Sequence, residues 1–159
     1  MFLFLSDGAI ITGSVEGNRI WGKDVKNVTF TRVEWSPDGK IIMIGTTDFE
    51  VHIYDFSGNF VRKIQISRGT HEDDTKLVAI KWSDLSLLET NDSNRCLMFA
   101  FDDGLVHLFK DDQDDYPLNV QTDLRLTSAE WNNIGDIFAV TGRSRLNSIV
   151  EGRKEDGSS

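Results

Sequence analysis

The sequence of 159 residues has little cysteine, little proline and a deficit of basic side chains. Its single cysteine, Cys96, excludes an internal disulfide and a zinc site built from several cysteines, and it favours an intracellular compartment. The formal net charge is −9. This acidic balance argues against sequence-independent binding to nucleic acid, which needs clustered lysine and arginine, and against binding to an anionic membrane surface.

Long hydrophobic runs are also absent. No stretch approaches the roughly 18–20 apolar residues of a membrane span, so the sequence predicts no direct membrane insertion. Residues 1–5 are apolar but are shorter than the core of a signal peptide, which needs about 7–15 residues, and they lack a basic start. Common motifs for hydrolysis, phosphate binding and zinc proteases do not occur. We therefore predict a protein that is not an enzyme and binds no cofactor, and we assign no catalytic, cofactor-binding or metal-binding residue.

What the sequence does contain is a repeat marked by tryptophan. The same three-residue pattern, an apolar residue, a variable residue and tryptophan, occurs three times and ends at Trp35, Trp82 and Trp131. The first two tryptophans are 47 residues apart, and the last two are 49 residues apart. Repeats near this length, made of short apolar runs and turns, are typical of four-stranded β-propeller blades. The equivalent positions of the three indoles predict that they pack in the core and do not form a ligand platform.

Alignment on these tryptophans predicts an all-β fold, a partial β-propeller of about three and a half WD-type blades that does not close. We expect the propeller in residues 1–142 and a polar, disordered tail in residues 143–159. The first blade lacks its first strand, and the pattern fades after Gly142, although residues 147–151 fall where a third strand belongs. The predicted blades cover approximately residues 1–25, 28–66, 77–122 and 124–151. We therefore expect a part of a larger propeller or a truncated gene product.

Within a blade, the pattern distinguishes the strands. Residues 41–44 form a continuous apolar run, which is suited to a strand covered on both faces. Residues 51–55 alternate between apolar and polar side chains, and residues 60–66 follow as the outer strand. The next blade repeats this order with an insertion between its first two strands, in which residues 85–89 are compatible with one helical turn.

Two pairs of polar residues recur at equivalent positions in the complete blades. Asp48 and Asp103 lie in matching turns, where an aspartate that accepts backbone hydrogen bonds fixes the loop, so we predict a structural role. His52 and His107 also match, and each side chain points to the opposite face from its apolar neighbours. They belong to separate blades and no third ligand repeats with them, so the sequence predicts no metal site.

Three further features have structural explanations. Cys96 begins a buried strand as a small apolar residue, and its surroundings should raise its pKa, which argues against a nucleophile. His71 lies in a linker and is predicted to be solvated. The acidic run Asp111–Asp115 lacks the glycine and distant glutamate of an EF-hand calcium loop. We predict a solvated hairpin loop that blunts strand pairing, with a weak contact to a basic partner as the alternative.

Two stretches carry a resemblance to a known family. They are GSVEGNRIWGKD at residues 13–24 and EVHIYDFSGNF at residues 50–60, connected through VEWSPDGKIIMIG at residues 33–45. Over about residues 1–142 the chain resembles the N-terminal WD-repeat propeller of a core subunit of intraflagellar transport complex A. Trp21 makes the resemblance more specific, because WD blades place no tryptophan on the outer strand by rule. A related propeller occurs in a tubby-like protein that acts as a ubiquitin-ligase adaptor.

The resemblance implies a non-enzymatic scaffold in retrograde ciliary transport. Members of the family carry two propellers and a long helical-repeat region, and they help membrane proteins to enter cilia. The implied partners are other complex A subunits and ciliary membrane-protein cargo, and the implied location is the cytoplasm, the cilium and the basal body. This chain departs from the family plan because it has Tyr54-Asp55 and Phe109-Lys110 in place of the usual Trp-Asp pairs, and because residues 143–159 do not follow the blade pattern.

Two alternatives to the transport scaffold stay open. One is a substrate receptor for protein degradation, and the other is a truncated gene product without an independent role. Because binding residues tend to lie on loops of a rigid scaffold, the candidate contact segments are the linker Ser67–Lys76, the insertion Leu85–Arg95 and the acidic loop Asp111–Asp115.

Overall fold

The computed structural model describes residues 2–6, 8–67, 74–83 and 96–145, the first of these ranges without its side chains. The described residues form thirteen strands in four antiparallel sheets, in each of which the strands follow chain order. Sheet I contains β1 (Phe2–Ser6), β2 (Ala9–Gly13) and β3 (Arg19–Asp24). Sheet II contains β4 (Phe30–Trp35), β5 (Ile41–Thr46), β6 (Glu50–Asp55) and β7 (Phe60–Gln65). Sheet III contains β8 (Leu77–Trp82), β9 (Leu97–Phe101), β10 (Leu105–Phe109) and β11 (Leu118–Gln121), and sheet IV contains β12 (Leu124–Trp131) and β13 (Phe138–Ser144).

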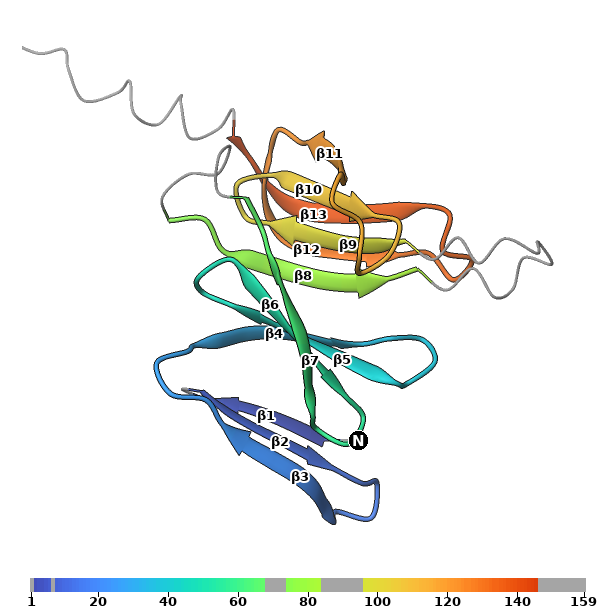
Figure 1. The fold of residues 1–159 in the computed structure, drawn as a ribbon. Helices are drawn as coiled ribbons and strands as arrows, with labels where there is room; N and C mark the ends of the chain where they lie inside the picture. Colours follow the sequence, from blue (N-terminus) through green and yellow to red (C-terminus); the bar gives the residue numbers. More distant parts are fainter. Residues whose placement is uncertain (1, 7, 68–73, 84–95, 146–159) are drawn as a thin grey trace, which may run out of the picture.

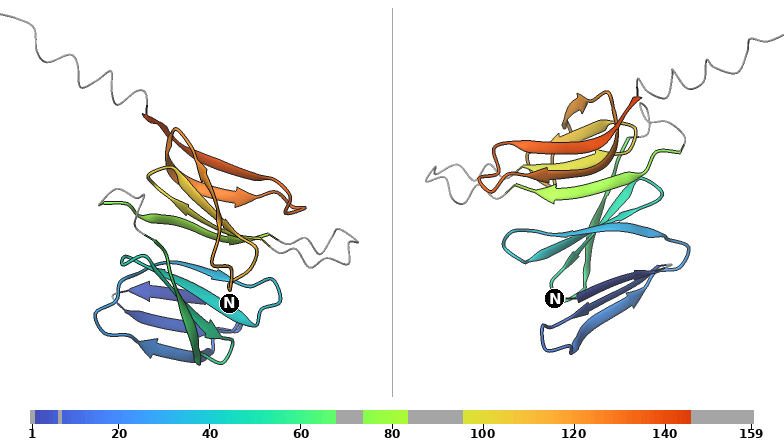
Figure 2. Two further views of the ribbon diagram at one scale, coloured as in Figure 1. Left: turned by 45° about the horizontal axis from the view of Figure 1, so that its top comes forward. Right: turned by 180° about the vertical axis from the view of Figure 1, so that it is seen from behind.

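The four sheets follow one another as layers, with sheets I and IV at opposite ends of the stack (Figures 1 and 2). Strand β4 packs beside β8, and β8 packs beside β12, so the first strands of sheets II, III and IV form the inner edge of the arc. The last strands, β3, β7 and β11, form the outer rim. This arrangement is a partial β-propeller that does not close, as the sequence predicts.

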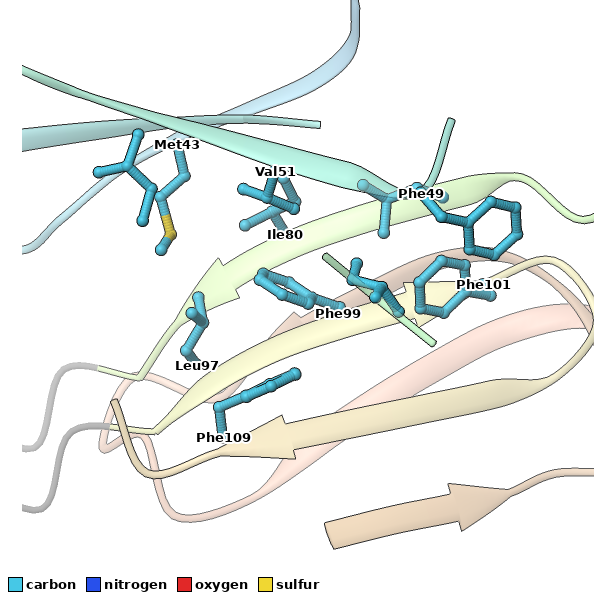
Figure 3. Close-up of a cluster of buried hydrophobic side chains, with 11 residues drawn as sticks. Met43, Phe49, Val51, Ile80, Leu97, Phe99, Phe101 and Phe109 are labelled. Atoms are coloured by element: carbon cyan, nitrogen blue, oxygen red, sulfur yellow. The ribbon is translucent and has the colours of Figure 1, made fainter. Parts of the chain in front are cut away.

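The core lies between the sheets, because the middle strands bury both of their faces. On β5, Ile42 and Ile44 pack toward sheet I, whereas Met43 packs toward sheet III. On β9, the odd-numbered residues pack toward sheet II and the even-numbered residues pack toward sheet IV. Figure 3 shows the cluster between sheets II and III, in which Phe99 and Phe101 are fully buried. The prediction of a strand covered on both faces at residues 41–44 is confirmed.

The repeat tryptophans pack against these clusters but are only half-buried. Trp35 contacts the cluster between sheets I and II, Trp82 the cluster between II and III, and Trp131 the cluster between III and IV. Each indole therefore faces the preceding sheet, and the Trp131 Nε1 donates a hydrogen bond to the Lys81 carbonyl oxygen at 3.2 Å. The predicted core role is confirmed, although the largest fully buried side chains are those of phenylalanine, isoleucine, leucine, valine and methionine.

The ends of the pattern differ slightly from the prediction. Strand β13 runs to Ser144, two residues beyond Gly142, because its pairing with β12 continues to the Leu124–Ser144 pair. Residues 85–89 and 147–151, for which the sequence suggested a helical turn and a third strand, lie outside the described residues.

The two stretches that carry the family resemblance meet at the outer rim between sheets I and II. The Trp21 Nε1 of β3 donates to the Phe56 carbonyl oxygen at 2.9 Å, in the turn between β6 and β7. The Trp21 ring lies 6.3 Å from the Tyr54 ring, and the Lys23 ammonium lies 5.3 Å from the centre of that ring. Gly58 has φ +85°, and a Cβ placed there would lie 2.6 Å from the Trp21 ring. We call this contact the rim lock.

Replacing Gly58 by alanine should therefore weaken the fold more than the same change at Gly39. Gly39 also has a positive φ, +68°, but a Cβ there meets nothing within 4 Å. We expect Gly39→Ala to cost about 1–2 kcal/mol from backbone conformation alone, and Gly58→Ala to cost about 1–3 kcal/mol more because Trp21 must move. Urea denaturation measures both losses, and equal losses would contradict the rim lock.

The open ends of the stack predict self-association of the isolated chain. Within the described residues no strand pairs with the outer edge of β13, and Ile20 on sheet I is 58% exposed. Unpaired strand edges act as templates for pairing with other chains. Gel filtration should show oligomers or poor recovery, whereas a sharp monomeric peak with cooperative unfolding would contradict this expectation.

Candidate functional site

The three candidate contact segments do not share one face of the stack. In an antiparallel meander the connections alternate between the two ends of the strands. The linker Ser67–Lys76 joins β7 to β8 at the same end as the β5–β6 turn. The acidic loop Asp111–Asp115 lies at the opposite end, which is also where β8 ends at Trp82 and β9 begins at Leu97 (Figure 1). The insertion Leu85–Arg95 itself lies outside the described residues.

A pocket of about 300 Å³ opens at the linker end between sheets II and III. Its apolar side is built by Phe49 and Phe101, whose rings stack with centroids 5.5 Å apart, and its rim carries threonine hydroxyls and charges of both signs. The linker residues that border the pocket, Thr75 and Lys76, are held by hydrogen bonds. The Thr75 hydroxyl donates to the Asp103 carboxylate at 3.2 Å, and the Lys76 amide donates to the Asp102 carboxylate at 2.7 Å.

The two matching turn aspartates behave differently. Asp103 is buried, and its Oδ1 accepts a hydrogen bond from the Leu105 amide at 3.0 Å, which confirms the predicted structural role. Asp48 is exposed, and in its turn the Thr46 hydroxyl accepts hydrogen bonds from the Asp48 and Glu50 amides, both at 3.2 Å. The prediction for Asp48 is therefore wrong, because a threonine two residues earlier supplies the same kind of acceptor.

The two matching histidines are buried, and each contacts a polar side chain of its own sheet. His52 Nε2 lies 3.1 Å from the Glu50 carboxylate, and His107 Nδ1 lies 2.6 Å from the Asn119 side-chain oxygen on β11. His52 Nδ1 is buried and has no hydrogen-bond partner among the described residues. Across residues 8–67, 74–83 and 96–145, the structure contains no group of three or more His, Cys, Asp or Glu residues that could hold a metal ion. His71 lies outside the described residues.

The acidic loop is held in shape by its own carboxylates. The Asp114 carboxylate accepts hydrogen bonds from the Lys110 and Tyr116 amides, both at 2.9 Å, and these bonds lower the pKa of Asp114. The Asp112 carboxylate lies 2.6 Å from the Arg62 guanidinium on β7 of the neighbouring sheet. The prediction of a solvated loop is therefore wrong for Asp112, which joins sheets II and III. A polar groove of about 460 Å³ lies beside this ion pair, between β7 and the loop.

Cys96 lies half-buried immediately before β9. Its amide donates to the Ser83 hydroxyl at 2.7 Å, and burial raises the pKa of the Cys96 thiol, to which the negative charge of Asp114 adds. The expected rise in pKa is confirmed, and it disfavours a reactive thiolate at neutral pH. A mostly apolar hollow of about 380 Å³ adjoins this residue and is bordered by Tyr116 and Leu118, which are 91% and 65% exposed.

Among the described residues, the arrangement therefore offers hollows that can contact other molecules. In the part of the chain that the structure describes, no helix has the length and hydrophobicity required to cross a bilayer. The hollows at the two ends of the strands combine apolar side chains with charges of both signs, as protein-binding surfaces combine an apolar core with a polar rim.

Comparison with known proteins places these features in context. The profile of the WDR35/TULP4 N-terminal β-propeller family matches residues 1–156. WD repeat-containing protein 35 of Rattus norvegicus is 36% identical over 141 residues, which cover 88% of this chain and 12% of that protein. The Homo sapiens protein of the same name is 36% identical over 137 residues, which cover 86% of this chain and 12% of the relative. Tubby-related protein 4 of Homo sapiens is 24% identical over 172 residues, which cover 91% of this chain and 11% of that protein. The chain thus spans about an eighth of the length of these relatives.

The Arg62–Asp112 ion pair should contribute measurably to the contact between sheets II and III. Both side chains are largely shielded, with 33% and 24% exposed, so we expect a coupling energy of about 0.5–1 kcal/mol from a double-mutant cycle with Arg62→Met and Asp112→Asn. The matched control is Lys40–Asp38, in which the atoms are 3.6 Å apart and the lysine is 76% exposed. A coupling energy no larger than that of the control would show that the acidic loop does not join the sheets.

Proposed function

The chain belongs to the WDR35/TULP4 N-terminal β-propeller family, and from this premise we propose that it is a non-enzymatic protein-interaction scaffold of the intraflagellar transport complex A machinery. The observation that carries the proposal is the 36% identity to WD repeat-containing protein 35 over 88% of the chain. The identity to Tubby-related protein 4 is lower, 24% over 91% of the chain. The rim lock adds physical support, because it uses residues from both stretches that carry the resemblance.

The proposed partners are other subunits of the transport complex and ciliary membrane-protein cargo, met in the cytoplasm, the cilium and the basal body. The stack suits such a role because sheets II and III are each buried between two neighbouring sheets and hold their loops on a rigid base. We propose that contacts use both ends of the strands, through the pocket at the linker and the groove beside the acidic loop. The division into a propeller and a tail remains part of this proposal, with the limit of the propeller at Ser144, where β13 ends, instead of Gly142.

A second candidate is a substrate receptor of a ubiquitin-ligase adaptor. It is favoured by the family profile, which joins both kinds of protein, and by the match to Tubby-related protein 4. The two candidates differ in the proteins that the chain should bind, so one experiment separates them.

Affinity purification of the tagged chain from ciliated cells tests the transport role. We expect subunits of the transport complex to be recovered with the native chain. They should not be recovered with the Met43→Asp variant, because a charge at this fully buried position unfolds the chain and so disrupts its binding surfaces. Recovery of ubiquitin-ligase subunits without any transport subunit would contradict the proposal and favour the second candidate.

A further inference from the structure

The pocket at the linker end, which we call the linker pocket, has all of its walls on sheets II and III and on the linker between them. Both sheets have a neighbouring sheet on each side, so the pocket does not depend on an uncovered end of the stack. Its apolar side is formed by the buried side chains of Phe49, Ile66, Leu77 and Phe101. Figure 3 shows the Phe49 and Phe101 rings together at one end of the cluster between the two sheets.

Phe49 occupies a position that is glycine in the equivalent turns of sheets I and III. The residue immediately before β2, β6 and β10 is Gly8, Phe49 and Gly104, respectively. All three residues have a positive φ, of +81°, +61° and +90°. This backbone conformation is exceptional for a bulky side chain. Residues that are held in such strained conformations concentrate at binding sites and active sites.

The connection to the next sheet also differs at this junction. At the two glycines a Cβ would clash with the main chain of that connection, at the carbonyl oxygens of Val25 and Thr122. The connection between sheets II and III is longer than the other two. The three connections comprise residues 25–29, 66–76 and 122–123. A long linker and a phenylalanine in place of glycine therefore occur together at the junction that contains the linker pocket.

The linker itself has no apolar side chain with which to fill the pocket. Residues 67–76 contain no leucine, isoleucine, valine, methionine, phenylalanine, tyrosine or tryptophan. An apolar wall that is open to water gains free energy when an apolar group from another molecule covers it. The volume of about 300 Å³ is at the lower end of the range for ligand pockets, which suits a single side chain better than a helix or a strand.

The charges that border the pocket leave an excess of positive charge. Glu50 forms an ion pair with Lys63. Arg32 donates to two main-chain carbonyl oxygens, and among the described residues no carboxylate pairs with it. Asp74 and Lys76 are exposed and form no ion pair within the part of the chain that the structure describes. Two cations and one carboxylate thus remain unpaired at the pocket, which favours a ligand with an acidic group.

We propose that the linker pocket binds an extended segment of a partner protein, which inserts one phenylalanine or leucine side chain and places a carboxylate next to it, beside Arg32 and Lys76. The inference rests on the proposed scaffold function and names the chemistry of one of its partners. The apolar side chain covers Phe49 and Phe101, and the carboxylate matches the unpaired cations. Because a guanidinium has five N–H donors and Arg32 uses two of them within the chain, donors remain for the carboxylate.

Short peptides provide the probe. The full chain is held at low density on a sensor surface, which prevents self-association, and surface plasmon resonance measures the dissociation constants of four peptides with blocked ends. Their sequence is Gly-Ser-X-Z-Ser-Gly, in which X is Phe or Ala and Z is Asp or Lys. We expect the Phe–Asp peptide to bind most tightly. Ala in place of Phe should weaken binding at least about tenfold because no ring is buried, and Lys in place of Asp should weaken it roughly three- to tenfold.

A charge reversal in the chain tests the position of the carboxylate. The Lys76→Glu variant should bind the Phe–Asp peptide more weakly and the Phe–Lys peptide more tightly than the native chain, each by roughly three- to tenfold. The matched control is Lys40→Glu, which makes the same change in the β4–β5 turn, at the opposite end of the strands. The control should alter neither dissociation constant, and equal effects of the two variants would overturn the assignment of the carboxylate to Lys76.

A second pair of variants tests the pocket itself. Thr47 and Asp48 are adjacent and exposed, but only Thr47 lines the pocket. Thr47→Trp should abolish binding of the Phe–Asp peptide, whereas Asp48→Trp should leave its dissociation constant within about twofold, with urea denaturation confirming that both variants fold. Absence of binding to the native chain, equal affinities of the Phe and Ala peptides, or binding that persists in Thr47→Trp would overturn the proposal.

A second copy of this chain is the other occupant to test. Analytical ultracentrifugation compares the native chain with the Thr47→Trp variant. An oligomer that this variant dissociates would assign the pocket to a second copy and overturn the assignment to a partner protein. None of these measurements uses transport subunits, so failure of the transport role is detected separately by the affinity purification.

Discussion

Burial of both faces of each middle sheet is the constraint on which the rest of the structure depends. Among the described residues no helix covers a β-sheet, so the apolar side chains of β5, β6, β9 and β10 leave water only when another sheet lies on each side. The three apolar clusters accordingly lie between sheets, and each cluster takes residues from two of them. Stability in such a stack is approximately a sum of contacts between neighbours, so among the described residues sheets I and IV, which each contact one neighbour, are held by fewer contacts than sheets II and III.

Polar contacts at the edges determine how the sheets are arranged, whereas the apolar faces provide most of the stabilisation. Apolar burial is non-directional, so it does not by itself select one rotation of a sheet against the next. The rim lock connects sheets I and II at the outer edge, and the Arg62–Asp112 pair connects sheets II and III. The Arg32 guanidinium donates to the Val78 carbonyl oxygen at 2.7 Å, and Lys81 of sheet III forms ion pairs with Glu34 of sheet II and Glu130 of sheet IV. These directional contacts lie at both edges of the arc, where a small rotation of a sheet would break them.

The fold could be predicted from the sequence because local patterns of residues indicate its strands and repeats. The spacing of the tryptophans revealed the repeat, and the apolar run at residues 41–44 revealed a strand buried on both faces. The site was harder to predict because it depends on which residues meet in space. Arg62 and Asp112 are 50 positions apart and share no motif, so no spacing rule connects them. Asp48 and Asp103 show a different limit, because the turn at Asp48 takes its acceptor from Thr46. The contact segments, in contrast, could have been assigned to the two ends of the strands from the strand order alone. In an antiparallel sheet successive connections alternate between these two ends.

The position of the family motif changes what family membership implies. GNRIWGKD and YDFSGNF contact one another at the junction of two sheets, where Trp21 fills the space that a side chain at Gly58 would need. The motif is thus explained by packing within the chain, and it carries no information about a ligand. A protein can therefore retain this contact and fold in the same way whatever partners it binds. The residue before each tryptophan is likewise explained within the chain, because the Lys81 ammonium lies 3.7 Å from the Glu34 carboxylate and 3.2 Å from the Glu130 carboxylate. Partner chemistry therefore has to be read from exposed positions that make no contact between the sheets.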